Sequence, residues 1–293
     1  MSTPPFIAMP DGVALSEPPE WPVPTLLAEP APSHGTALLV PGFTGSKEDF
    51  LAVLAPLAAL GWRAAAMDLP GQAGFPGLGP RGSHTPAALA QSVRAEIDRL
   101  DDGRGVHLVG HSMGGLVTRE VVLADTSGLA SWTLLCSGPG PVPAATWPSL
   151  QALSQAIGVL PMTAIWQQKE AADRAGGWTP PSDDVATFVR RRFLANDPDA
   201  LADFATILMT APDRTELAAA ALATAGLPSA VVTGERDDAW PPDEQERMAI
   251  RLAVPWHLLP GVGHSPAAED PRLAATVLHD IFSHAAGMAH VDA

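Results

Sequence analysis

The chain has 293 residues, 46% of them hydrophobic, which is enough to bury one sizeable core with an inserted subdomain. Its 17 basic and 32 acidic residues give a net charge of −15, which disfavours nucleic acid and anionic membranes as partners because both repel an acidic surface. A single cysteine, Cys136, excludes an intramolecular disulfide, and the absence of any run of about 18 apolar residues argues against a membrane span.

Strand and helix patterns alternate over the first half of the chain. Short apolar runs that end at turn residues are typical of buried strands, and apolar residues spaced three and four apart separate them as helices. This alternation predicts a mainly parallel sheet covered by helices on both faces. The predicted strands are 25–28, 36–40, 62–67, 106–109 and 132–135; the predicted helices run from Ser46 to Gly61, over 85–100 and over 113–123.

The alternation stops between residues 139 and 226. This segment reads as five successive helices, over 149–157, 162–175, 183–194, 198–209 and 215–225. Strand and helix patterns then resume, with strands at 230–233 and 256–259 and helices at 243–252 and 271–284. We therefore expect an α/β core formed by residues 1–138 and 227–293, interrupted by a helical cap at 139–226. The alternative is a helical stretch that only packs on the sheet edge.

The sharpest local motif is Gly110-His111-Ser112-Met113-Gly114, which matches G-x-S-x-G. A predicted strand leads into it and a predicted helix leads out, which is the setting that an exposed nucleophilic serine needs. Glycines on either side remove Cβ atoms that would collide in such a strained turn. Ser112 is therefore the predicted nucleophile; the alternative is a glycine-rich turn without catalysis.

A serine hydroxyl is a weak nucleophile and needs a histidine to accept its proton. His264 is the candidate, because it lies in a glycine-flanked loop just after the last predicted strand. His257 competes but falls inside that strand, while His107 and His111 are too near Ser112 in sequence to reach back as its base.

An acidic partner for His264 is expected after the strand at 230–233. Asp237 is the chosen residue, with Asp238 and Glu235 as alternatives in the same loop. The loop after the preceding strand, Ser137-Gly138-Pro139-Gly140, contains no carboxylate, which favours the later position. The expected role of Asp237 is to fix the tautomer of His264 and to stabilise its protonated form.

Two backbone amides should stabilise a developing oxyanion. One is the amide of Met113, directly after the nucleophile. The other is expected in the loop Pro41-Gly42-Phe43-Thr44-Gly45, where Phe43 is the best donor because proline has no N–H. The alternative is an ordinary strand-to-helix loop.

Taken together, the ordered motifs resemble the α/β-hydrolase superfamily, of the esterase, lipase and haloperoxidase-like kind, over residues 36–282. The resemblance implies the α/β-hydrolase fold and a Ser-Asp-His triad. Two departures are Pro41-Gly42, where the family commonly has His-Gly, and Gln72, where relatives often have histidine. The matching stretches are 40–46, 68–72, 110–115, 233–237 and 263–266.

Relatives of this fold differ in the nucleophile. In the superfamily that this chain resembles, haloalkane dehalogenases and epoxide hydrolases use an aspartate at this position, and dienelactone-hydrolase-like members use a cysteine. Ser112 argues against these classes and favours acyl transfer. The predicted substrate is a small or medium, largely apolar carboxylic ester, bound near Thr44, Trp147 and Trp166. Most aromatic residues of the cap are expected to form its own core.

Other substrates and roles stay open at this point. A thioester, lactone, lysophospholipid or amide fits the same triad, and acids such as Glu170, Asp173 or Glu216 would suit a substrate amine, although solvated helix faces are the simpler reading. A non-catalytic receptor on this fold is a further alternative.

The remaining expectations concern cofactors, partners and location. No metal or organic cofactor is implied, and the only predicted partner is the small-molecule substrate; the oligomeric state stays open. The first six residues have neither a basic start nor an apolar segment, and one cysteine fits a reducing compartment, so we expect a cytoplasmic protein.

Overall fold

A computed structural model describes residues 3–16 and 23–287. Its centre is one eight-stranded sheet with the order β1-β2-β4-β3-β5-β6-β7-β8, in which only the pairs β1–β2 and β2–β4 are antiparallel. The predicted mainly parallel sheet is confirmed. The strands are β1 Val13–Ser16, β2 Thr25–Ala28, β3 Gly35–Val40, β4 Trp62–Met67, β5 Val106–His111, β6 Leu129–Leu135, β7 Ser229–Gly234 and β8 Trp256–Leu259.

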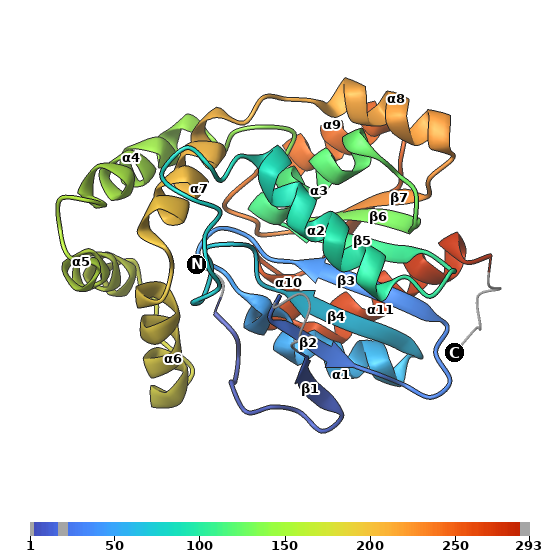
Figure 1. Cartoon of the computed structure of the whole chain (residues 1–293), viewed down its shortest axis with the longest axis horizontal. Helices are drawn as coiled ribbons and strands as arrows, with labels where there is room; N and C mark the ends of the chain where they lie inside the picture. The colour runs from blue at the N-terminus through green and yellow to red at the C-terminus, as the bar shows by residue number, and fades with distance from the viewer. Residues whose placement is uncertain (1–2, 17–22, 288–293) are drawn as a thin grey trace.

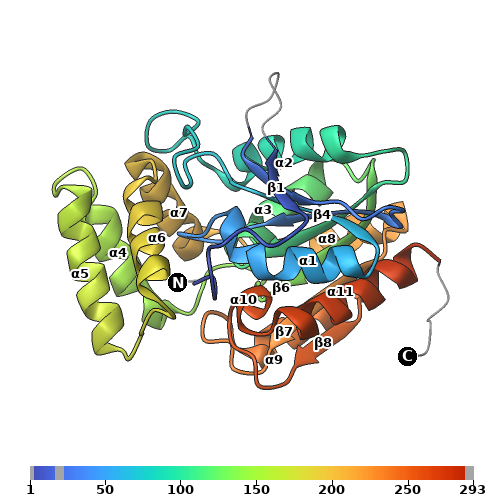
Figure 2. The same cartoon turned by 90° about the horizontal axis from the view of Figure 1, so that it is seen from below.

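Helices cover both faces of this sheet (Figure 2). One face is packed by α2, α3, α8 and α9, and the other by α1 and α11, because the central strands carry apolar side chains toward both sides. All six residues of β3 and of β5 are buried. The helices are η1 Lys47–Phe50, α1 Leu51–Ala59, α2 Pro86–Leu100, α3 Met113–Ala124, η2 Ala144–Thr146, α4 Trp147–Ala156, α5 Met162–Ala175, α6 Asp183–Leu194, α7 Pro198–Thr210, α8 Thr215–Ala225, α9 Pro242–Leu252, α10 Pro266–Glu269 and α11 Pro271–Ala285.

The parallel strands bring distant loops to one edge. Strands β3, β5, β6, β7 and β8 run in the same direction and pair in register along the sheet. The loops that follow their carboxyl ends therefore meet at one end of the molecule, on the side where α7 and α10 lie (Figure 1). In α/β sheets this edge is where ligands bind.

The helices between β6 and β7 fall into two groups. Helices α4 to α7 lie beyond the carboxyl edge of the sheet (Figure 1), and α5, α6 and α7 share an apolar cluster that includes Trp166, Phe188 and Phe193. Helix α8 instead packs with α3 and α9 over the sheet. The predicted cap segment 139–226 thus contains one helix that belongs to the core layer.

Two buried carboxylates, those of Asp49 and Asp203, connect the α6–α7 region to the core. Arg192 of α6 pairs with Asp49 of η1, and both side chains are almost fully buried. Asp203 of α7 accepts from the ring Nδ1 of buried His84 at 3.0 Å and from the amide of Gly82. Because a buried charge without its partner is strongly destabilising, these contacts restrict how the helices sit on the sheet.

Three short elements were not predicted from the sequence. Strand β1 has only Val13 fully buried, so its apolar pattern is weak, and its four residues form an edge ribbon with β2. The short helices η2 and α10 have three and four residues, which is too few for a helical periodicity. Residues 1–2, 17–22 and 288–293, which the sequence assigns to the core segments, lie outside the described residues.

Burial of His107 in β5 makes folding stability depend on pH. Its ring stacks on Phe282 with centroids 4.6 Å apart, and burial lowers its pKa from 6.5 to about 4. Between these values the unfolded chain binds the additional proton, so the contribution of His107 is complete above pH 6.5 and is lost as the pH falls toward 4. We expect His107→Asn to reduce the slope of unfolding free energy by about 1.4 kcal/mol per pH unit in this range.

Urea unfolding of both proteins between pH 4.5 and 7.5 measures this slope. His34→Asn is the matched control, because His34 is exposed. An unchanged slope in the His107 variant contradicts the assignment of a buried neutral histidine.

Candidate active site

Ser112 occupies the turn between β5 and α3. Its backbone has φ 56° and ψ −126°, a conformation that is unfavourable for a residue with a side chain. The amide of Ser112 donates to the carbonyl of Leu135 at 3.0 Å, which fixes the turn to β6. The sequence prediction of a strand, a sharp turn and a helix around Ser112 matches these elements.

Close packing around the turn explains two glycines. A Cβ on Gly114 would lie 2.4 Å from the carbonyl oxygen of Val40, and a Cβ on Gly42 would lie 2.7 Å from the Cβ of Ser112. Backbone and a buried side chain cannot yield to such contacts. The loop after β3 therefore runs directly beside the serine.

His264 connects Ser112 with Asp237. Its Nε2 lies 2.9 Å from the Oγ of Ser112, and its Nδ1 lies 2.8 Å from the Oδ1 of Asp237. This arrangement fits the tautomer that carries its proton on Nδ1 and accepts the serine proton on Nε2. The structure brings together the three residues that the sequence predicts for this role, from the loops after β5, β7 and β8.

Asp237 is held as a carboxylate by several donors. Burial alone would raise the pKa of Asp237, but the hydrogen bond and charge of His264, with donors from Ala239 and Gln245, outweigh it and lower the pKa. Gln245 of α9 donates to Oδ2 at 2.8 Å. The alternatives lie elsewhere, since Asp238 is exposed and Glu235 accepts from the amide of Gly261.

The backbone around His264 is fixed from two sides. The carboxylate of Glu269 accepts from the amides of Gly263 at 2.7 Å and Ser265 at 2.8 Å, which are the residues on either side of the histidine. His111 lies 2.7 Å, through its Nε2, from the carbonyl oxygen of His264 itself. Burial, with a contribution from His264, lowers the pKa of His111 to about 4, so at neutral pH this ring is uncharged and donates its Nε2 proton to that carbonyl.

Gln72 orients the loop that contains Phe43. Its Nε2 donates to the carbonyl of Gly42 at 2.8 Å, while its Oε1 accepts from the amide of Leu69. In a trans peptide the N–H points opposite to the C=O, so this bond turns the amide of Phe43 away from Gln72. Within residues 3–16 and 23–287, the amides of Phe43 and Met113 have no hydrogen-bond acceptor.

The three predicted pocket residues have different surroundings. Thr44 is buried in the loop after β3, with φ 55°. Trp147 packs partly against the main core, and its Nε1 donates to the carbonyl of Val142. Trp166 is buried in the cluster of α5 and α6, 5.4 Å from the ring of Phe193, and among the described residues its Nε1 has no acceptor.

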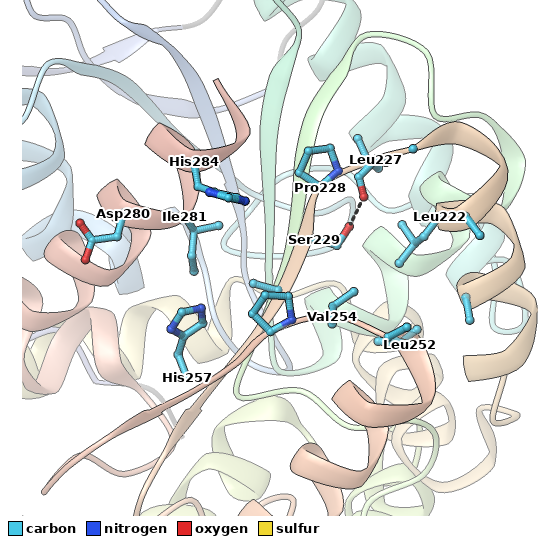
Figure 3. A pocket seen from close by; sticks show the side chains of 16 residues that line it. Leu222, Leu227, Pro228, Ser229, Leu252, Val254, His257, Asp280, Ile281 and His284 are labelled. Carbon is cyan, nitrogen blue, oxygen red and sulfur yellow. Dashed lines mark hydrogen bonds between the residues drawn. The ribbon is translucent and has the colours of Figure 1, made fainter. Parts of the chain in front are cut away.

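Other candidate residues lie away from Ser112. His257 lines a cavity at the opposite ends of β7 and β8 (Figure 3). In the described part of the chain, no group of three His, Cys, Asp or Glu side chains is arranged to hold a metal ion. Nor is any of the described helices long and apolar enough to cross a membrane.

Sequence reasoning missed the residues that orient the site. His111, Gln245 and Glu269 were not predicted, and Gln72 stood out only as a departure from a familiar pattern. The position of His111 next to Ser112 is the one signal in the sequence, because any side chain there must lie close to the reacting groups. For Gln245 and Glu269 the sequence contains no comparable signal.

The sequence profile described as the Alpha/beta hydrolase family matches residues 37–277. No curated protein sequence matches the chain.

Solved structures match the fold. A thermophilic esterase from Thermogutta terrifontis superposes with a TM-score of 0.70 at 22% identity, covering 93% of this chain and 98% of the other. A hydrolase from Pseudomonas aeruginosa PA01 gives 0.67 at 22% identity, covering 92% and 98%. A structure from a study of carboxylesterases of Nitrososphaera gargenis gives 0.70 at 18% identity, covering 94% and 99%. At these identities the likeness establishes the α/β-hydrolase fold.

The contact between His111 and His264 generates a stability prediction. His111→Leu leaves the carbonyl of His264 without this donor, which we expect to cost about 1–3 kcal/mol of unfolding free energy. His111→Gln keeps an N–H group at the same distance from the backbone and should lose clearly less. Urea unfolding at pH 7.5 measures both, and a leucine variant as stable as the glutamine variant contradicts the assigned bond.

Proposed function

The chain belongs to the alpha/beta hydrolase family, and on that premise we propose that it is a serine hydrolase that cleaves carboxylic esters through an acyl-enzyme on Ser112. The observation that supports this most is the continuous set of contacts from Ser112 Oγ through His264 to Asp237, at 2.9 and 2.8 Å. Such a series of hydrogen bonds both activates the serine hydroxyl and stabilises the protonated imidazole.

In the proposed acylation step, Ser112 Oγ attacks the ester carbonyl carbon while its proton moves to Nε2 of His264. The carbonyl oxygen becomes an oxyanion, for which the amides of Phe43 and Met113 are the proposed donors. When the intermediate collapses, the bond to the alcohol oxygen breaks and His264 returns the proton to that oxygen. The alcohol leaves and the acyl group stays on Ser112.

Deacylation repeats these steps with water. A water molecule gives a proton to His264 as its oxygen attacks the acyl carbon, and the proton then returns to Ser112 Oγ as the carboxylic acid departs. Asp237 keeps Nδ1 protonated throughout, and Gln245 and Ala239 hold its carboxylate in place. Because Glu269 and His111 fix the backbone on both sides of His264, the ring is aligned before substrate arrives.

We propose that helices α4 to α7 form the cap over this site, while α8 belongs to the core. Phe43 packs against both the main core and the apolar cluster shared by α5, α6 and α7, so the loop after β3 lies where the two regions meet. Trp240 is buried with its ring 6.3 Å from that of His264. These apolar surroundings support a largely apolar acyl group, with Thr44, Trp147 and Trp166 as the proposed lining.

The alternative substrates are not equally supported. The acids considered for a substrate amine all have cationic partners on their own or a neighbouring helix: Glu170 with Arg174, Asp173 with Lys169 and Glu216 with Arg251. An aminopeptidase-like reading is thereby disfavoured. Thioesters, lactones and lysophospholipids use the same steps with another leaving group, and a cytoplasmic location remains our prediction from the sequence. The complete hydrogen-bonded chain disfavours a non-catalytic receptor.

A panel of acyl esters and thioesters tests this proposal. We expect p-nitrophenyl esters of two to eight carbons to be hydrolysed, with kcat/KM falling by about 10⁴-fold or more in Ser112→Ala because the covalent step is lost. Ser137→Ala is the matched control, since Ser137 is also buried and lies beside Gly115 of α3, but among the described residues its hydroxyl forms no hydrogen bond to His264 or Asp237. Equal rates for wild type and Ser112→Ala would falsify the proposal. A clear preference for thioesters would change the proposed substrate class from carboxylic esters to thioesters.

A further inference from the structure

The cavity lined by His257 lies at the opposite end of the sheet from Ser112 and is called the hollow below. It has a volume of about 830 Å³ and lies where β7 and β8 begin, next to Ser229 and Pro255. Asp237 and His264 follow the other ends of the same two strands. Since the strands are parallel, the hollow and the candidate active site are separated by the length of the sheet.

Most of the wall of this hollow is apolar. Leu222 of α8 and Leu252 of α9 face it from one side, and Ile281 of α11 faces it from the other (Figure 3). All three side chains are at least nine-tenths buried, so the wall is part of the packed protein. The volume falls in the range of about 300–1,000 Å³ that is typical of small-molecule sites.

Polar side chains gather on the α11 side. His257 of β8 and Asp280 and His284 of α11 lie there, with the two helix residues four positions apart and so on one face (Figure 3). In the part of the chain that the structure describes, none of these three side chains has a hydrogen-bond or ion-pair partner. An apolar wall next to polar side chains that have no partner in the protein suits an amphipathic ligand.

The charge of the lining residues indicates which ligand head group fits the hollow. Asp280 is the only Asp, Glu, Lys or Arg side chain among the lining residues, and the whole chain has a net charge of −15. Burial lowers the pKa of His257 although the charge of Asp280 opposes the shift, so the half-buried ring is neutral at pH 7 and can accept a hydrogen bond. An anionic head group would meet repulsion here, and a cationic one would meet complementary charge.

We propose that this hollow is a binding site for a small apolar amine. Its hydrocarbon part lies against Leu222, Leu252 and Ile281, and its ammonium group lies at the rim between Asp280 and His257. The site is separate from Ser112 and does not depend on the proposed esterase activity.

Three probes of equal chain length and different charge test the proposal: octylamine, octan-1-ol and octanoate, titrated into the whole protein by calorimetry at pH 7.5. We expect octylamine to bind one site per chain and to bind about tenfold more tightly than octanoate. Asp280→Asn should weaken octylamine roughly two- to fivefold, as the loss of a partly exposed ion pair does, and leave octan-1-ol unchanged.

Matched variants place the binding in the hollow. Ala223→Trp fills it from α8 and should abolish binding, whereas Ala220→Trp, at an exposed position of the same helix outside the lining, should not. Asp11→Asn removes one charge from an exposed remote position and controls for net charge. Ser112→Ala should bind octylamine as the wild type does.

The proposal is overturned if octanoate binds as tightly as octylamine, if neither binds, or if Ala223→Trp binds undiminished. Octylamine binding that disappears in Ser112→Ala also overturns it, because the probe then occupies the candidate active site. Thermal unfolding of each variant checks folding, and Asp280→Asn, an exposed substitution, keeps the test valid if Ala223→Trp does not fold.

Discussion

The site depends on the backbone of one residue. Ser112 holds a positive φ at the end of a fully buried strand, a conformation that typically costs about 1–3 kcal/mol and persists only where its surroundings enforce it. Those surroundings are the hydrogen bond from its amide to the carbonyl of Leu135 and the close packing of Gly114 against the backbone of Val40. The hydroxyl is thereby lifted from the end of β5 toward the loops of the neighbouring strands, and the remaining groups converge on it.

The groups around Ser112 come together because of the strand order of the sheet. The same order explains why much of the fold and of the candidate site could be predicted from the sequence. Motifs at the ends of successive apolar runs become neighbours once those runs are parallel strands, so the sequence alone could predict that Ser112, Asp237 and His264 lie together, with the loop of Phe43 beside them. The long helices and central strands were recognisable for the same reason, since their apolar periodicity extends over several residues. The family likeness over residues 37–277 agrees with that reading.

The rest of the site was not predictable because it depends on tertiary contacts between side chains of neighbouring helices and the loops of the triad. Gln245 reaches Asp237 from a helix, and Glu269 binds two amides from a one-turn helix that has no periodicity of its own. His111 was set aside as a base on account of its position, and the same position lets it bind the carbonyl of His264. Such roles are defined by where a side chain points in the fold, which residue type and spacing do not encode.

The proposed mechanism requires Ser112 to be a nucleophile activated by His264. The most direct measurement is mass mapping of the protein after reaction with a fluorophosphonate, with wild type, Ser112→Ala and His264→Ala compared. The account predicts one phosphonyl group per chain on the peptide that contains Ser112, no adduct in Ser112→Ala and a much slower reaction in His264→Ala. An adduct on another residue, or equal labelling of all three proteins, would contradict it.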